Sequence, residues 1–157
     1  MKKIVKNIIE HQNNNNIAIT STSHPPLYYN ELKLLIKNIS SQLAANDISN
    51  KDRAAIVLPN GPYMATSFLA ISSYMSAAPL NPNYKAEEFE FYLGDLKPKI
   101  LIVEPNSKNP AVEVAKKLKI PVREIKTKEN TPSGMFDLFK NTKNFELPNE
   151  EDESLVL

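Results

Sequence analysis

The chain has 157 residues, of which 19 are basic and 18 acidic, so its formal net charge is +1. A chain of this length buries about two-thirds of the surface that its unfolded form exposes, which suffices for one compact domain. The even balance of charge excludes the clustered basic excess that nucleic acid or an anionic lipid surface requires. The sequence has no cysteine, which excludes disulfides, thiolate nucleophiles and zinc sites with cysteine ligands.

The first 16 residues predict a short helix followed by a polar connector. The positively charged start is typical of a secretion signal, but Lys6, Asn7 and Glu10 interrupt the sustained apolar segment that such a signal needs. We therefore expect a cytoplasmic protein. The four asparagines at 13–16 are too few for an aggregation-prone tract, and they favour a connector in front of a strand.

Two short strands and a long helix follow this connector. Residues 17–20 and 27–29 predict the strands, and Asn30 is placed to cap the helix, which ends near residues 46–47. Apolar side chains recur along one face of this helix. They are Leu32, Leu35, Ile36, Ile39 and Leu43, and the residues expected to face outward include Lys33, Lys37 and Ser40.

Residues 54–84 contain no charged side chain, although 24% of the chain is charged. A gap of this length indicates either a membrane span or the interior of a layered domain. A span needs about 20 predominantly apolar residues, but the Pro-Asn-Gly-Pro sequence at 59–62 and several hydroxyl side chains break the segment. We therefore predict a strand–helix–strand unit, with residues 54–58 and 76–80 as strands that are buried on both faces.

We expect the helix of this unit to begin at Pro62. Proline suits the first helical position, because the backbone N–H group that it lacks would have no partner in the helix there. Asn60 or Gly61 can cap it. Its predicted buried face follows the spacing i, i+4, i+7 and i+11. The residues at these positions are Met64, Phe68, Ile71 and Met75.

Residues 86–96 can be interpreted in two ways. The alternating Glu-Phe-Glu-Phe at 88–91 suits a strand. Helical spacing instead connects Phe89, Tyr92, Leu93 and Leu96. Acidic residues at 87 and 88 also suit the positive end of a helix dipole, so we predict a helix.

The following elements continue the alternation of strands and helices. Residues 100–103 form a continuous apolar strand, Asn109 caps a helix, and residues 121–125 predict another strand. The inward residues expected in that helix are Val112, Ala115 and Leu118. This alternation indicates an α/β fold with a mainly parallel sheet and flanking helices.

Periodicity is largely lost over residues 126–153, which we expect to form an irregular connector. Residues 135–139 predict a single helical turn packed onto the domain. The acidic run at 150–153 favours a solvated connector over a metal site. Residues 154–157 resemble the start of a further buried strand, and a domain seldom ends where a core strand begins. We therefore expect an α/β core at residues 17–125 within an incomplete domain.

The search for chemical motifs is mostly negative. The three glycines are isolated, so they form neither a dinucleotide-binding turn nor a phosphate-binding loop. The two histidines, His11 and His24, lie in polar stretches and favour a surface location over a catalytic role. The adjacent Asp52 and Arg53 favour a local ion pair over a functional role.

Residues 60–61 have the placement of a ligand-binding site, because they lie at the carboxyl end of a predicted strand and the start of a helix. As a helix cap they need no ligand, and we favour this structural interpretation. Packing is favoured over base stacking for Tyr63, Tyr74, Tyr84 and Tyr92. We therefore predict no catalytic, cofactor-binding or metal-binding residue in this chain.

Several segments together resemble the adenylate-forming acid–CoA ligases, also called AMP-dependent synthetases. They are residues 28–32, 52–62, 76–84, 87–93 and 100–103, and they follow the order and spacing of that family over about residues 8–157. The sequences at 77–82 and 88–93 are most similar to the oxalate–CoA ligase branch. The commoner family form has a glycine near Met75, which this chain lacks.

This resemblance implies an incomplete N-terminal subdomain of the ligase fold. In the complete family, ATP and a carboxylate give an acyl-adenylate and pyrophosphate, and the thiol of coenzyme A then displaces AMP. The reaction uses Mg²⁺, a Ser/Thr/Gly-rich phosphate loop that follows a strand similar to residues 154–157, a ribose-binding aspartate and a mobile lysine. None of these motifs maps onto this chain. The resemblance thus implies an N-terminal fragment that is inactive alone and binds no cofactor by itself.

The expected partners are the remainder of the ligase or a second copy joined through the unfinished sheet. An exposed sheet edge promotes association, so we expect self-association or poor solubility. An alternative is a non-catalytic α/β module or split-ligase subunit that pairs with a separately encoded remainder. An unrelated flavodoxin-like or receiver-like domain is disfavoured, because residues 54–58 lead into Pro-Asn-Gly without an acidic phospho-acceptor or a Gly-rich turn.

Overall fold

The computed structural model describes residues 5–144 and residue 155. The strands are β1 (Ile17–Ile19), β2 (Leu27–Tyr28), β3 (Arg53–Val57), β4 (Ser76–Pro79), β5 (Ile100–Val103) and β6 (Val122–Glu124). The helices are α1 (Val5–Glu10), α2 (Tyr29–Ala45), α3 (Pro62–Ser72), α4 (Ala86–Leu96) and α5 (Pro110–Lys117). β1 and β2 pair in antiparallel orientation, and the other strands form a parallel sheet in the order β4-β3-β5-β6.

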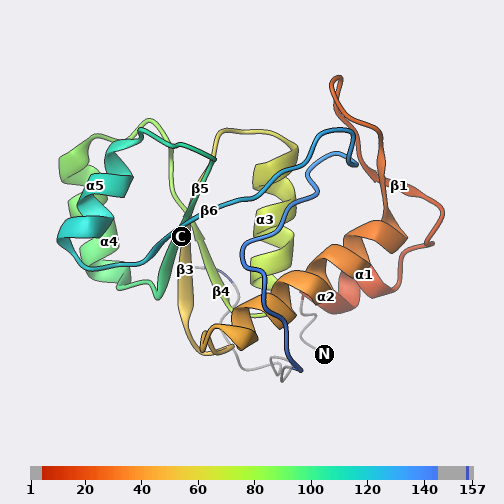
Figure 1. Ribbon diagram of the computed structural model, residues 1–157, viewed down its shortest axis with the longest axis horizontal. Helices are drawn as coiled ribbons and strands as arrows, with labels where there is room; N and C mark the ends of the chain where they lie inside the picture. The colour runs from red at the N-terminus through yellow and green to blue at the C-terminus, as the bar shows by residue number, and fades with distance from the viewer. Residues whose placement is uncertain (1–4, 145–154, 156–157) are drawn as a thin grey trace.

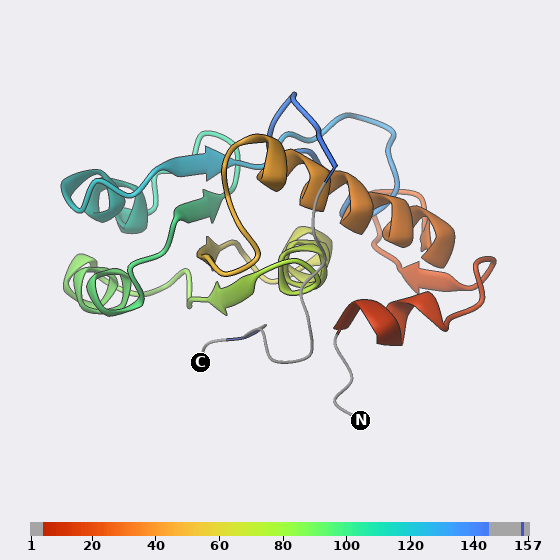
Figure 2. The same cartoon turned by 90° about the horizontal axis from the view of Figure 1, so that it is seen from below.

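The parallel sheet lies between two layers of helices. Figures 1 and 2 show α4 and α5 on one side of the sheet and α2 and α3 on the other. The crossover from β3 to β4 uses α3, and the crossovers to β5 and β6 use α4 and α5. The predicted α/β fold with a mainly parallel sheet and flanking helices is therefore confirmed.

Strand β3 is buried on both faces, which explains the long uncharged segment. Ala54 and Ile56 belong to the core on the α2–α3 side, whereas Ala55 and Val57 belong to the core on the α4–α5 side. This follows from the two-residue period of a strand. A charged side chain at these positions would be removed from water, so the layered structure excludes charge here.

The strand–helix–strand interpretation of residues 54–84 is confirmed by β3, α3 and β4. Within the described part of the chain, no helix has both the length and the apolar character needed to cross a membrane. The absence of charge in this segment thus reflects burial between protein layers.

Helix α3 begins at Pro62 as predicted, and Gly61 is its N-cap. The backbone of Gly61 has φ 152° and ψ −171°, a region that essentially only glycine adopts. Gly61, and not Asn60, is therefore the N-cap of α3. It caps the helix through its backbone conformation.

The predicted inward face of α3 is confirmed, but the buried face is wider than predicted. Ile71 and Met75 are buried, and the half-buried Met64 and Phe68 pack against the same core. Thr66, Ser67 and Ala70 are fully buried as well. The Thr66 hydroxyl is tolerated inside because carbonyl oxygens surround it, that of Gly134 at 2.7 Å and that of Pro62 in its own helix at 3.0 Å. Hydroxyl side chains that bond to their own helix need no water, so a small polar face can pack as an apolar one does.

The cap predicted for α2 is also wrong. The helix begins at Tyr29 rather than after Asn30, and the Tyr28 backbone N–H donates to Glu31 Oε2 at 2.9 Å. Helix α4 begins in the same way, with the Lys85 N–H donating to Glu88 Oε2 at 2.9 Å. A glutamate at the third helical position satisfies the N–H group in front of each helix, so a polar cap residue is not required.

Three further side chains lie on a different side from the one that periodicity predicts. Ser40 is buried and donates to the Ile36 carbonyl oxygen at 2.8 Å. Tyr92 and Leu118 are each 38% exposed. The Tyr92 ring stacks on Tyr84, and Leu118 follows the last residue of α5.

Residues 126–144, called the returning segment, cross back over the helices after β6. Figures 1 and 2 show this blue segment passing α3 and α2. The helical turn predicted at 135–139 is wrong, because Asp137 forms an antiparallel bridge with Lys126 instead. Its packing onto the domain is confirmed, since Phe136 and Leu138 are buried.

Residue 155 lies beside the edge strand of the parallel sheet. Leu155 forms a parallel bridge with Ala77 of β4. This contact agrees with the further strand predicted at 154–157, of which the other residues lie outside the described part of the chain. The acidic run at 150–153 lies outside it as well.

Candidate functional site

The carboxyl ends of β3 and β4 border a cavity of about 470 Å³. Asn60 and Met64 line one side of this cavity, and residues 80–83, which follow β4, line the other. In parallel α/β sheets, ligands bind outside the carboxyl ends of the strands. The structure thus places Asn60, for which the sequence favoured a structural role as a helix cap, beside a cavity.

Asparagine side chains order the loop on the β4 side of the cavity. The Asn83 backbone N–H donates to Asn81 Oδ1 at 2.9 Å, and Asn109 Nδ2 donates to the Pro82 carbonyl oxygen at 2.8 Å. Asn109 Oδ1 also accepts a bond from the Ala111 N–H at 3.0 Å, as its predicted cap role requires. Asn81 and Asn83 were not predicted to be functional residues, although they follow directly on the predicted strand at 76–80.

The lining of this cavity permits binding but supplies no reactive group. No acidic, basic or histidine side chain lines it, and its polar side chains are the amides of Asn60, Asn81 and Asn83. Amides donate and accept hydrogen bonds but do not exchange protons at neutral pH. Over residues 5–144 and 155, no group of three or more His, Cys, Asp or Glu side chains could hold a metal ion.

The histidines and most of the tyrosines occupy the places expected for packing and surface residues. His11 is exposed, and the His24 ring packs edge-to-face on Tyr63 with centroids 6.1 Å apart. Tyr74 is buried, and its hydroxyl donates to the Ile48 carbonyl oxygen at 2.9 Å.

Asp52 and Arg53 lie at the amino end of β3, at the edge of the sheet opposite the cavity. Asp52 Oδ2 accepts a hydrogen bond from the Ser49 N–H at 2.7 Å, which closes the turn in front of the strand. Both residues line a second hollow at this amino edge.

The rings of Tyr84 and Tyr92 are stacked, with centroids 5.1 Å apart. The hydrogen bond between their side chains, together with partial burial and the charge of Glu88, raises the pKa of Tyr84. Tyr92→Phe removes the hydrogen bond, so we expect the pKa of Tyr84 to fall toward the ordinary tyrosine value of about 10. Ultraviolet titration of tyrosinate measures this shift. Tyr63→Phe is the control, and an unchanged Tyr84 titration in Tyr92→Phe would contradict the assignment.

Comparison with known proteins identifies the family. The family model described as "AMP-binding enzyme" matches residues 9–155. The chain belongs to the AMP-binding enzyme family. The family resemblance of the sequence blocks is therefore confirmed, and the cavity at the carboxyl edge is part of an AMP-binding enzyme domain.

Curated relatives of this AMP-binding family member are CoA ligases. The chain is 43% identical over 88 residues to an oxalate–CoA ligase of Arabidopsis thaliana, which covers 55% of this chain and 17% of that protein. It is 46% identical over 57 residues to an oxalate–CoA ligase of Saccharomyces cerevisiae, which covers 36% of this chain and 10% of that protein. The chain thus spans about a fifth or less of the length of these relatives.

Solved structures of the same fold cover most or all of this chain. Apo MatB from Rhodopseudomonas palustris matches with a TM-score of 0.77 at 19% identity, and the match covers 100% of this chain and 32% of MatB. The AMP complex of o-succinylbenzoate CoA synthetase from Bacillus subtilis matches with a TM-score of 0.65 at 21% identity, covering 76% of this chain and 30% of that one. The parallel sheet with flanking helices is therefore the N-terminal part of the adenylate-forming ligase fold.

Proposed function

We propose that this chain is the N-terminal part of an AMP-forming carboxylic acid–CoA ligase and that it does not catalyse the reaction alone. The observation that carries the proposal is the family match over residues 9–155, combined with a carboxyl-edge cavity that has no proton-transferring side chain. The role of the chain is to build one sheet and one wall of a site whose reactive groups come from the remainder of the ligase.

The residues of the described part do not fit the phosphates of ATP or a Mg²⁺ ion. The described chain has no glycine-rich loop at a helix start, and it has no cluster of three metal-ligating side chains. We therefore assign no step through ATP, Mg²⁺ or coenzyme A to this chain. These cofactors belong to the complete ligase.

The partner that we propose is the remainder of the ligase, joined at the β4 edge of the sheet. The parallel bridge from Leu155 to Ala77 supports this arrangement, because it shows that the β4 edge takes up parallel pairing from a segment that follows the returning segment. The acid substrate that we propose is oxalate. The support for oxalate is the similarity of the chain to the Arabidopsis and yeast oxalate–CoA ligases.

A first experiment measures ATP–pyrophosphate exchange by the purified chain with oxalate and a panel of other carboxylic acids. We expect no exchange above the blank, because the side chains that line the described carboxyl-edge cavity include no group that activates a carboxylate. ATP–pyrophosphate exchange by the chain alone would overturn the proposal that the reactive groups come from the remainder of the ligase.

A second experiment replaces the matched segment of the Arabidopsis oxalate–CoA ligase with the corresponding segment of this chain. We expect the chimera to form oxalyl-CoA, since the two segments are 43% identical. A chimera that folds and binds ATP but forms no thioester with any acid would contradict the ligase assignment. If the chimera formed a thioester with another acid instead, the ligase assignment would stand and the proposal that the substrate is oxalate would be contradicted.

A further inference from the structure

The outward face of α4 carries an aromatic ridge. Phe91 is 70% exposed, and its ring contacts Tyr92 edge-to-face with centroids 5.3 Å apart. Tyr92 in turn stacks on Tyr84 at 5.1 Å. The opposite face of α4 already buries Phe89 and Leu93 in the core, so the ridge is an addition to the packing of the fold. Contiguous exposed aromatic side chains are typical of binding surfaces.

Acidic side chains surround this ridge. Glu87, Glu88 and Glu90 are exposed on the first half of α4, and none of them forms an ion pair with another residue that the structure describes. Glu87 and Phe91 are four residues apart, so they are neighbours on one helix face. The first half of α4 is therefore an apolar knob with an acidic rim.

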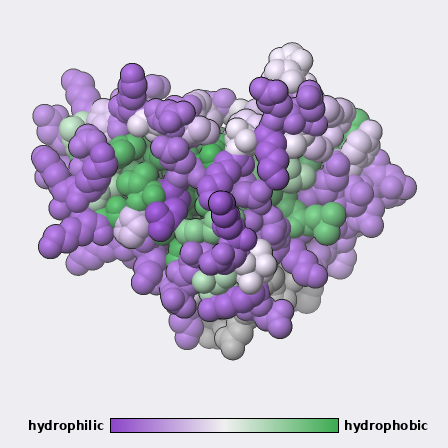
Figure 3. Space-filling model, in the orientation of Figure 1, coloured by the Kyte–Doolittle hydropathy of each residue, from purple (hydrophilic) through white to green (hydrophobic). Residues whose placement is uncertain are grey.

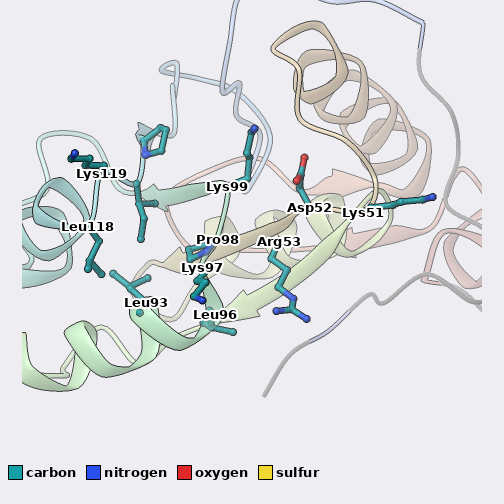
Figure 4. A pocket seen from close by; sticks show the side chains of 13 residues that line it. Lys51, Asp52, Arg53, Leu93, Leu96, Lys97, Pro98, Lys99, Leu118 and Lys119 are labelled. Atoms are coloured by element: carbon teal, nitrogen blue, oxygen red, sulfur yellow. The ribbon is translucent and has the colours of Figure 1, made fainter.

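The other end of α4 opens into the hollow at the amino edge of the sheet, which has a volume of about 810 Å³. Its apolar floor comprises Leu93, Leu96, Leu118 and Ile120, and its basic rim comprises Lys51, Arg53, Lys97, Lys99 and Lys119. Asp52 is the acidic residue in this lining. Figure 3 shows apolar side chains beside α4 and α5, bordered by hydrophilic ones, and Figure 4 shows the rim from close by.

The rim cations do not all point the same way. In Figure 4, Lys97 and Arg53 extend to one side of the sheet edge, whereas Lys51 and Lys119 point away from the hollow. Lys97 and Lys119 lie at the C-terminal ends of α4 and α5, where a positive charge offsets the negative end of the helix dipole. This stabilising role does not require a second copy of the chain. Of the two cations on that side, Lys97 is the C-cap of α4 and therefore belongs to the same helix as the aromatic ridge.

Gly94 joins the knob to the hollow. It lies in the interior of α4, where glycine destabilises a helix relative to alanine, and it lines the hollow. A Cβ atom added at Gly94 would meet nothing within 4 Å, so the fold of one chain gives no steric reason for glycine here. Gly94 follows Phe91 by three residues and therefore lies beside it on the helix surface. The glycine leaves room for a side chain that comes from outside.

We propose that two copies of this chain associate through α4 in antiparallel, two-fold symmetric contact. Phe91 of each copy enters the hollow at Gly94 of its partner, and the acidic half of one α4 meets the Lys97 end of the other. A two-fold interface requires a self-complementary surface. In this chain, the aromatic ridge with its acidic rim and the hollow with its basic rim both lie on α4. Glu87 and Lys97 are about 15 Å apart along the helix axis. The charges oppose each other correctly only in the antiparallel arrangement.

Sedimentation equilibrium of the full chain tests this proposal. We expect a dimer in reversible exchange with the monomer, and we expect Phe91→Glu to weaken dimerisation by about 30-fold or more, as for an interface hot spot. The matched control is Leu34→Glu, because Leu34 of α2 is 65% exposed and lies outside this surface. Leu34→Glu should leave the dimer unchanged. Circular dichroism should show that both variants keep the fold.

Charge reversal then tests the orientation. Glu87→Lys and Lys97→Glu should each weaken the dimer about threefold to tenfold, and the double variant in one chain should recover most of the loss. A monomeric wild-type chain would overturn the proposal. A dimer that persists in Phe91→Glu would also overturn it and would point to association through the β4 edge. Failure of the double variant to recover would overturn the antiparallel arrangement.

Discussion

Gln42→Leu will lower the free energy of unfolding by about 3 kcal/mol. Gln42 is only 2% exposed, and its Oε1 atom accepts hydrogen bonds from the backbone N–H groups of Leu138 and Phe139, both at 2.8 Å. Its Nε2 atom donates to Asp137 Oδ1 at 2.7 Å. Leucine has a similar volume but leaves two backbone donors without an acceptor beneath the returning segment. The cost is therefore that of unsatisfied buried groups, with little contribution from lost volume.

Urea unfolding followed by circular dichroism measures this change, with the slope of the transition checked for constancy. Asn38→Ala is the matched control, because Asn38 Nδ2 donates to the same Asp137 oxygen at 2.8 Å but lies on the exposed side of α2. Water can replace the lost donor there, so we expect a loss of about 0.5 kcal/mol or less. Equal losses for the two variants would show that Gln42 has no special role in holding the returning segment.

Gly134→Ala will destabilise the fold by about 3 kcal/mol, through strain where the returning segment crosses α3. Gly134 has φ +76°, a conformation that disfavours side chains other than glycine. A Cβ atom there would lie 2.7 Å from the Pro62 carbonyl oxygen and 2.7 Å from Thr66 Cγ2. The returning segment cannot move away from α3 without breaking a hydrogen bond, because Thr66 Oγ1 donates to the Gly134 carbonyl oxygen at 2.7 Å.

Gly94→Ala is the matched control for this substitution. Gly94 lies in a helix and has free space around its Cα, so alanine should raise the free energy of unfolding by about 0.5–1 kcal/mol. Both variants are compared by thermal unfolding at a concentration where the chain is monomeric. A stable Gly134→Ala variant would mean that the returning segment shifts away from α3 with little loss.

The fold was largely predictable from the sequence, because burial on both faces leaves a direct trace in it. The strands at 54–58 and 100–103 consist of consecutive apolar residues, and Pro62 and Asn109 mark the starts of two helices. Helix faces were predicted less well. Thr66 and Ser40 are buried although they are polar, because backbone carbonyl oxygens accept hydrogen bonds from their hydroxyl groups in the core.

The candidate site was only partly predictable. The position at residues 60–61 followed from the strand–helix order, since the carboxyl ends of parallel strands are common ligand-binding places. The contact that holds the loop against α5 was missed, because the bond from Asn109 to Pro82 joins residues 27 apart in sequence. No local pattern encodes a contact over that distance.

The order of apolar runs and helix starts was sufficient to predict an α/β layered domain and its family, because each of these signals depends on neighbours within a few residues. The tertiary structure alone decided how the returning segment is held. Its hydrogen bonds to Gln42 join residues 95 to 97 apart, and the space around Gly134 is set by α3, 68 residues earlier. The same holds for the uncharged segment at 54–84: its lack of charge indicated burial, and only the assembled layers placed successive strand residues in two separate cores.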